Sequence, residues 1–239
     1  MYNFTKFLMV AQPYAIAIVF ILTYAAEHII PERKESIDHK HDFKNIAAGL
    51  INLFLIAFVG FKFQQVIEWF NSKNFGILRI IHFSTAVQTI IGVLCIDLFM
   101  YWWHRANHEW KFLWFFHKFH HKDEKLNSTS GFRFHSGELL LSYVFKLFFF
   151  ALMGINVLSI LLHSIIFFPI VLFHHSNLKI SERLDFFLRN FLVTPRMHRI
   201  HHSVIKSETN SNYSSLLPYW DIIFHSYIKR PAKSIKFGV

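Results

Sequence analysis

The stretch LLLSYVFKLFFFALMGINVLSILLHSIIFFPIVLF, residues 139–173, decides the fold of this chain. It is predominantly apolar, and a helix needs only about 20 apolar residues to cross the hydrocarbon core of a membrane. The stretch is therefore too long for a single crossing. Gly154, Ile155 and Asn156 would break a helix near its middle. We expect a helical hairpin of two short arms that returns to the side of the membrane it left.

Three more apolar blocks precede this hairpin, at residues 10–30, 46–63 and 80–103. Each is long enough for one crossing, the second only just. The first block is too long for a signal-peptide core and lacks a small-residue cleavage site, so we interpret it as a retained anchor. The sequence predicts an all-α, integral membrane helical bundle.

The overall composition agrees with a membrane protein. Of the 239 residues, 53% are hydrophobic and 17% are charged, whereas soluble domains have about 25% charged residues. The net charge of +10 is better explained by basic loops that face an anionic leaflet than by nucleic acid. The only cysteine, Cys95, excludes a disulfide framework and a cysteine-based zinc site.

The basic residues of the short loops predict the orientation. Residues 31–44 contain four lysines or arginines, whereas residues 71–79 contain only two. The first loop should therefore be cytosolic. The third block then ends in the cytosol, where the polar segments 104–138 and 174–239 would form a helical cap. We expect N-terminal anchor helices over residues 1–92 and a catalytic domain over residues 93–239. The membrane would be the inner membrane in a bacterium or the endoplasmic reticulum in a eukaryote.

Histidine is gathered in three short motifs: HRANH (104–108), HKFHH (117–121) and HRIHHS (198–203). Histidines four residues apart share one face of a helix. Neutral imidazole binds iron, zinc, copper and nickel, and eight clustered imidazoles exceed one tetrahedral site. We therefore predict two metals. Asp97 would lie on the same helix face as the first motif and could orient a ligand imidazole. The isolated histidines are expected to be structural: His28, His39, His41, His82, His163 and His225.

DLFMYWWHRANH, HKFHH and TPRMHRIHHS together resemble the fatty acid hydroxylase/sterol desaturase superfamily of membrane oxygenases. The resemblance covers most of residues 93–228 and includes LNSTSGFRFHSGE, FHHSNL and NYSSLLPYWDIIFHSY. The chain departs from the family pattern at four positions. Ser136 replaces a proline, Ser214 and His225 replace glycines, and Ser226 replaces a threonine.

The resemblance implies a non-haem di-iron centre that uses O2 to hydroxylate or desaturate a C–H position of a fatty acyl, sterol or isoprenoid lipid. Zinc could replace iron in a purified sample. No haem, flavin or nicotinamide motif is visible, so electrons should come from an external donor such as cytochrome b5 or ferredoxin. The expected metal ligands are His104, His108, His117, His120, His121, His175, His198, His201 and His202. Further candidates for the metal shell or its support are His135, His174, Asp97, Arg133, Glu138, Asn177 and Asp221. Arg133 and Glu138 would form an ion pair that shapes the site, and Asn177 and Asp221 would hold histidine rings.

Two other classes of protein stay open at this point. A metal transporter would need polar residues in the middle of the membrane, where the blocks offer little beyond Asp97. A non-catalytic zinc-binding membrane protein would keep the histidines without turnover. The sequence does not distinguish a hydroxylase from a desaturase, and it does not identify the lipid.

Overall fold

The computed structural model describes residues 2–81, 83–230 and 235–239. One histidine expected to be structural, His82, lies outside them. The regular secondary structure of the described residues is helical, apart from one isolated β-bridge. The helices are α1 (Tyr2–Ile29), α2 (His39–Ser72), α3 (Ile77–Ile80), α4 (Thr85–Glu109), α5 (Lys111–His121), the 3-10 turn η1 (Ser128–Phe132), α6 (Ser136–Met153), α7 (Val157–His175), α8 (Glu182–Leu188), α9 (Pro195–His201), α10 (Lys206–Thr209) and α11 (Tyr219–Ile223).

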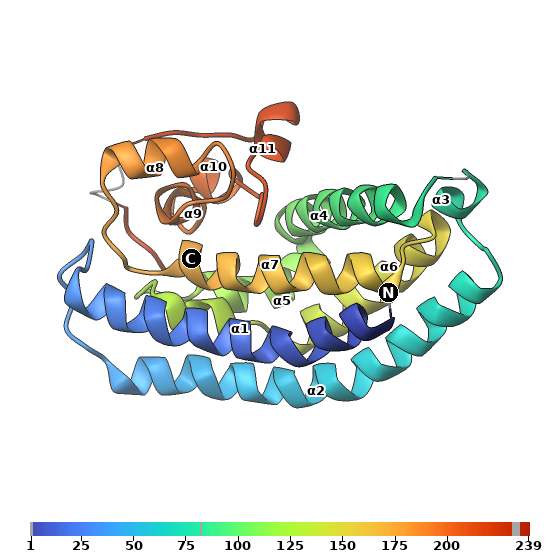
Figure 1. The fold of residues 1–239 in the computed structure, drawn as a ribbon. Helices are drawn as coiled ribbons and strands as arrows, with labels where there is room; N and C mark the ends of the chain where they lie inside the picture. The colour runs from blue at the N-terminus through green and yellow to red at the C-terminus, as the bar shows by residue number, and fades with distance from the viewer. Residues whose placement is uncertain (1, 82, 231–234) are drawn as a thin grey trace.

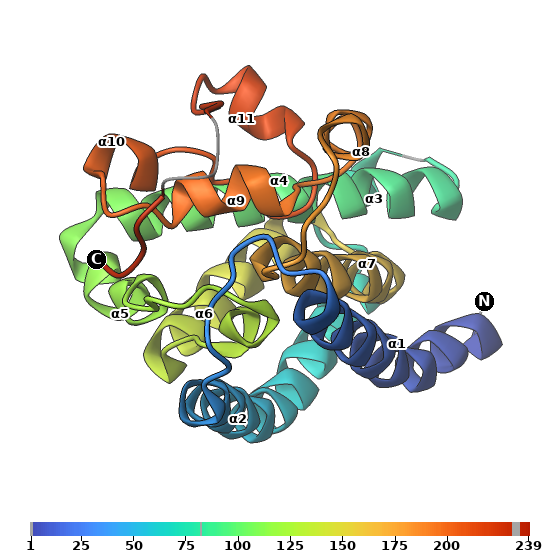
Figure 2. The same cartoon turned by 90° about the vertical axis from the view of Figure 1, so that its left-hand side faces the viewer.

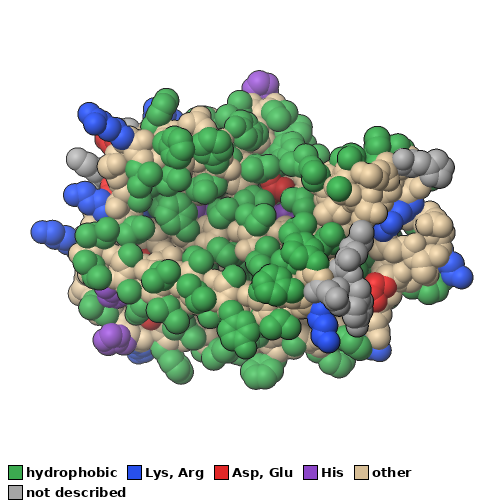
Figure 3. All heavy atoms as spheres, viewed as in Figure 1, with side chains coloured by type: hydrophobic (Ala, Val, Ile, Leu, Met, Phe, Trp, Pro, Cys, Tyr) green, Lys and Arg blue, Asp and Glu red, His purple; other side chains and the backbone are tan. Residues whose placement is uncertain are grey.

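Five of the described helices are long and apolar enough to cross a membrane: α1, α2, α4, α6 and α7. They lie side by side, with α1 along α7 and α2 along α6 (Figures 1 and 2). Large apolar side chains cover much of the outer surface (Figure 3). A soluble protein rarely exposes so much contiguous apolar surface, whereas lipid tails would cover it. The all-α membrane bundle is confirmed.

Two helices joined by a turn occupy the stretch predicted to form the hairpin. Its arms are α6 and α7, and the chain turns at Gly154, which has the left-handed φ of 73°. Asn156 begins α7, and its side chain accepts a hydrogen bond from the amide of Ser159 at 2.7 Å. The two arms diverge from this turn: α6 packs on α2, and α7 packs on α1 and α4.

A second turn meets the hairpin at the same end of the bundle. A Cβ atom on Gly76 would lie 2.3 Å from the Cα of Gly154, so the two glycines allow the backbones to touch. Below them, buried apolar residues from four elements form a core: Ile67, Leu78, Ile96, Phe150 and Ile155. The end of the bundle that lacks the histidine motifs is therefore fixed by close backbone contact and apolar packing.

Helix α2 is longer than the apolar block 46–63 suggests. It has 34 residues, or about 51 Å at 1.5 Å per residue, which exceeds the ~30 Å hydrocarbon core. Asp38 caps its first turn by accepting a hydrogen bond from the amide of His41 at 3.1 Å. Asn74, with a positive φ of 52°, follows its end. Both ends of α2 therefore continue the helix beyond the apolar block.

The opposite end of the bundle is polar inside, and it collects all three histidine motifs. The first loop lies there too, because the amide of Glu32 donates to the carbonyl of Asn177 at 2.7 Å and the amide of Lys179 donates to the carbonyl of Ile30 at 2.9 Å. The short helices α8 to α11 fold over this end beside α4 and α7 (Figure 1). The histidine motifs and the first loop thus share one end of the bundle, the arrangement that the loop charges predicted.

Candidate metal centre

The nine histidines predicted as metal ligands meet in two adjacent groups at the polar end of the bundle. Within each group, one nitrogen of every ring lies within 4.8 Å of those of the other rings. All nine side chains are buried. The first group is His104, His108, His117, His121 and His201, and the second group is His120, His175, His198 and His202.

Four elements build the two groups, and two of these elements serve both. On α5, His117 and His121 turn to the first group, whereas His120, one residue before His121, turns to the second. On α9, His201 joins the first group, and His198 and His202 join the second. Helix α4 supplies only the first group, and α7 supplies only the second. The H-x2-HH spacing therefore lets one short helix contribute to two neighbouring sites.

Backbone carbonyls fix the tautomer of several rings. Nδ1 of His104 lies 2.7 Å from the carbonyl oxygen of Tyr213, and Nδ1 of His201 lies 2.7 Å from that of Ser211. A carbonyl only accepts, so each Nδ1 must carry the proton and donate it. Nε2 then carries no proton, and its lone pair is available to a metal ion among the other histidines. Such a hydrogen bond is the usual support of a metal-binding imidazole.

The second group makes the strongest case for a cation. His120 donates from Nδ1 to the carbonyl of Arg133 at 3.1 Å, and His175 donates to that of Val171 at 2.7 Å. Each Nε2 atom then carries a lone pair and no proton, yet the two Nε2 atoms face each other at 3.1 Å. His198 Nε2 lies 3.0 Å from those of His175 and His202. Metal–nitrogen bonds of about 2.0–2.1 Å hold ligand nitrogens roughly 3 Å apart, so a bound metal ion would replace this repulsion with attraction.

The first group contains further nitrogens without a partner. Among the described residues, no hydrogen bond reaches Nε2 of His117 or His201, or either ring nitrogen of His121. Buried polar atoms are nearly always hydrogen-bonded in proteins. The donor set, five imidazoles in one group and four in the other, suits iron and zinc. The residues present therefore fit two transition-metal ions.

Burial keeps the imidazoles in the neutral form that binds metals. It lowers the pKa of His201 to about 3. The pKa values of His120, His121, His198 and His202 are likewise lowered well below the usual value, first by burial and then by the neighbouring histidines. A metal ion competes with protons for these nitrogens, and in this environment the protons bind weakly.

Glu138 at the start of α6 orients a ring of the first group. Its Oε1 atom lies 2.9 Å from Nδ1 of His117 and accepts a hydrogen bond from the side-chain amide of Asn107 at 3.2 Å. The expected ion pair between Arg133 and Glu138 is wrong. Arg133 instead donates to the carbonyl of Phe119 and to Asn45 of α2, because α2 passes closer to its guanidinium than α6 does.

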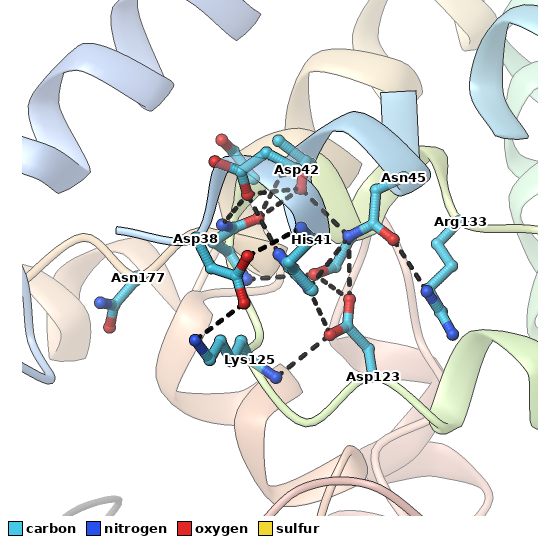
Figure 4. Close-up of polar contacts among 12 residues, drawn as sticks. Asp38, His41, Asp42, Asn45, Asp123, Lys125, Arg133 and Asn177 are labelled. Carbon is cyan, nitrogen blue, oxygen red and sulfur yellow. Dashed lines mark hydrogen bonds and ion pairs between the residues drawn. The ribbon is translucent and has the colours of Figure 1, made fainter. Parts of the chain in front are cut away.

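A polar network ties the second motif to the start of α2 (Figure 4). Asp123 accepts hydrogen bonds from Asn45 at 3.1 Å and from Ser130 at 2.7 Å, and its other oxygen lies 2.6 Å from Nε2 of His41. Asn45 also accepts from Arg133 at 3.0 Å. The network holds the segment 123–133, whose last residue supplies the carbonyl for His120. His41, expected to be structural, is one of its members.

Four other candidates are not members of either histidine group. Asp97 is buried but accepts from Trp220 at 2.7 Å and from the amide of Leu217, so it fastens the C-terminal segment and does not orient an imidazole. The exposed His135 caps α6, with its ring accepting from the amide of Gly137. The Asn177 side chain bonds to the backbone of Arg33. His174 packs beside His198, with ring centroids 4.0 Å apart, outside both groups.

Asp221 acts on the histidines through the backbone. It accepts hydrogen bonds from the amides of Tyr213 and Ser214 and from the hydroxyl of Ser226. This holds Tyr213, whose carbonyl accepts from His104, in place. Sequence reasoning missed the carbonyls of Tyr213, Ser211 and Val171 as partners of the rings, because a backbone carbonyl leaves no trace in residue identity.

The tail that follows departs from the family pattern, but it keeps a tight turn. His225 stands where the resemblance expects a glycine, and it has a left-handed φ of 57°.

A comparison with known protein families supports the resemblance. The sequence profile of the family described as "Fatty acid hydroxylase" matches residues 89–226. The chain belongs to the fatty acid hydroxylase family.

Curated relatives within the fatty acid hydroxylase family carry names of lipid oxygenases. The chain is 30% identical over 150 residues to the ornithine lipid hydroxylase OlsE of Rhizobium tropici, covering 62% of this chain and 44% of that protein. It is 26% identical over 145 residues to the alkylglycerol monooxygenase of Danio rerio, covering 61% of this chain and 31% of that protein. The chain thus spans less than half the length of these relatives. No solved structure matches it.

Proposed function

We propose that this protein is a membrane-bound, O2-dependent di-iron oxygenase that hydroxylates a lipid. The observation that carries the proposal is the pair of buried histidine groups, with ring nitrogens that lack hydrogen-bond partners and face one another. Family membership supports an oxidoreductase, and the names of two relatives support hydroxylation of lipids. A desaturation would use the same site, but neither relative is named for one.

The proposed reaction converts one C–H bond to C–OH. One atom of O2 enters the product, and the other leaves as water after two electrons and two protons are supplied. Two iron ions held by the two histidine groups would supply the activation of dioxygen. The protein's own residues keep the imidazoles neutral, fix their tautomers and exclude water, because all nine rings are buried.

The substrate and the electron donor are also part of the proposal. The histidine groups lie at the ends of α4 and α7, which are both candidate membrane helices, so a lipid could reach them without leaving the bilayer. The end that carries the first loop would face the cytosol, as the basic residues of that loop suggest. An external donor such as cytochrome b5 or ferredoxin would dock there.

The test combines metal analysis with oxygen labelling. Protein purified without chelator should contain two metal ions per chain. With iron, a reductant and 18O2, a lipid extract should gain a product that carries one 18O atom. His201→Ala should lose at least one metal and the product, since a methyl group cannot replace an imidazole ligand.

His225→Ala is the matched control, because this histidine is exposed and belongs to neither group. It should keep the metal and the product. Full activity in His201→Ala would disprove the two-metal site. A chain that binds two ions but incorporates no 18O would instead be a non-catalytic metal-binding protein.

A further inference from the structure

A cavity of about 180 Å³ lies inside the membrane part of the bundle, among α2, α4, α6 and α7. Most of its lining is apolar. On α4 it reaches Met100, one turn before His104, and on α7 it reaches Phe168, two turns before His175. The cavity therefore begins close to both histidine groups and extends from them into the hydrocarbon region. Its position suits the chain of a bound lipid.

One charged group, Lys146 of α6, lines this cavity. The described residues give it no hydrogen bond and no ion pair, and its ammonium only lies over the ring of Tyr143, 5.7 Å from the centroid. An ionisable side chain in the middle of a membrane is costly and usually has a function. Sequence reasoning missed this lysine, because one charge does not interrupt an apolar block.

A second polar group faces the same cavity. His163 of α7 is buried and lines it, and its Nε2 atom has no hydrogen bond. It faces Oδ1 of Asp97 at 3.7 Å, whereas Trp220 and Leu217 donate to the other oxygen, Oδ2. Glu138, on the same helix as Lys146, is engaged by His117 and Asn107. His163 thus has Asp97 as a nearby anion, whereas the ammonium of Lys146 has no ion pair among the described residues.

We propose that Lys146 binds the carboxylate of a fatty acid, which makes a free fatty acid the substrate class. This inference rests on the proposed function. An anion removes the cost of an unpaired buried charge, whereas a neutral lipid would leave the ammonium unpaired. The cavity has room for a compact carboxylate and part of a chain, but not for a glycerophospholipid head.

The position of Lys146 also orients the chain. Lys146 follows Glu138 by eight residues, or about 12 Å along α6, and Glu138 contacts the first histidine group. A chain that runs from a carboxylate at Lys146 along the cavity toward Met100 and Phe168 would reach the histidine end of the bundle. The carbon that is oxidised would lie along the chain and not beside the carboxyl group.

Equilibrium binding of radiolabelled oleate tests the inference. The full chain is placed in nanodiscs of phosphatidylcholine, and methyl oleate, which has no charge, serves as the second probe. Lys146→Met should weaken oleate binding by about tenfold to a hundredfold, the usual effect of a charge-assisted hydrogen bond, and should leave methyl oleate binding unchanged. Lys62→Met is the matched control, since this lysine of α2 is exposed and does not line the cavity.

Equal oleate affinity in Lys146→Met and the unaltered chain would overturn the inference, as would methyl oleate binding as tightly as oleate. Metal content gives the second readout. If Lys146 only balanced the charge of Glu138, Lys146→Met would lose metal and would not discriminate between the two probes, which also overturns the inference. Binding needs no turnover. A chain that binds oleate through Lys146 but forms no product would therefore disprove the proposed function alone.

Discussion

Glu138 is the residue through which α6 acts on the histidines of α5. Its carboxylate lies 2.9 Å from Nδ1 of His117, so it both orients the ring and makes its other nitrogen more basic. We expect Glu138→Gln to weaken metal binding about tenfold, the lower end of the effect of losing such a partner. Competition with a chromogenic chelator measures this affinity. Glu35→Gln, which alters an exposed carboxylate paired with Arg33, should leave it unchanged. Equal affinities in both variants would contradict the role of Glu138.

The buried histidines of α5 and α9 also predict a pH dependence. In the folded chain the pKa of His201 is lowered to about 3 by burial, whereas the unfolded chain has the ordinary value near 6.5. Between these values the unfolded chain binds more protons, so the free energy of unfolding should fall as the pH falls from about 6.5 toward 3. Metal release should occur in the same window, because protons compete with the metal. Thermal melting in detergent at several pH values measures this loss, and a melting temperature independent of pH from 7 to 4 would contradict it.

At the residue scale, spacing predicted eight of the nine histidines that the structure brings together, because H-x3-H and H-x2-HH have a defined meaning on a helix. The ninth, His175, came from the family resemblance. Spacing failed for the supporting residues. Asp97 shares its helix with His104, yet it bonds to Trp220, more than a hundred residues later. Arg133 and Glu138 have opposite charges, but in the tertiary structure Arg133 bonds to Asn45 and Glu138 bonds to His117. The partner of each side chain depends on which helices pack against one another.

Among the elements, the turn between α6 and α7 depends on a single glycine. Gly154 has a φ of 73°, and a Cβ atom there would lie 3.0 Å from the Arg79 side chain. We expect Gly154→Ala to lower the stability by about 1–2 kcal/mol, the cost of a left-handed residue with a side chain. Scanning fluorimetry in detergent measures the change in melting temperature.

Gly60→Ala is the control for that experiment. Gly60 lies within α2, and a Cβ atom there would approach no atom closer than 3.7 Å. Alanine favours a helix over glycine, so this variant should melt at the same or a higher temperature. If both variants melt alike, the turn does not limit stability.

The sequence predicted the long elements better than their packing. Apolar length located the membrane helices, and Gly154 with Asn156 located the turn. The two arms of the hairpin, however, pack on different neighbours. The length of α2 was underestimated, because its polar ends, such as His39–Asn45, carry no apolar signal but continue the helix.

For the whole molecule, the two ends of the bundle should differ in access from outside the cell. We expect cysteines at Lys122 and Lys206 to be shielded from an impermeant thiol reagent in intact cells, and a cysteine at Ser72 to react. All three positions are exposed on the protein, so only the membrane would shield them. A Cys95→Ala background removes the native thiol. Labelling in the opposite pattern would reverse the orientation without affecting the histidine groups.

The joint use of α9 by both histidine groups has a consequence for biosynthesis. A ribosome adds about 5–20 residues per second, so the 77 residues from His121 to His198 take roughly 4–15 s. During this interval the nascent chain already holds four of the five histidines of the first group, but only His120, and later His175, of the second. If the two groups hold metal ions as proposed, metal delivered before translation has passed α9 would meet a nearly complete first group and an incomplete second group.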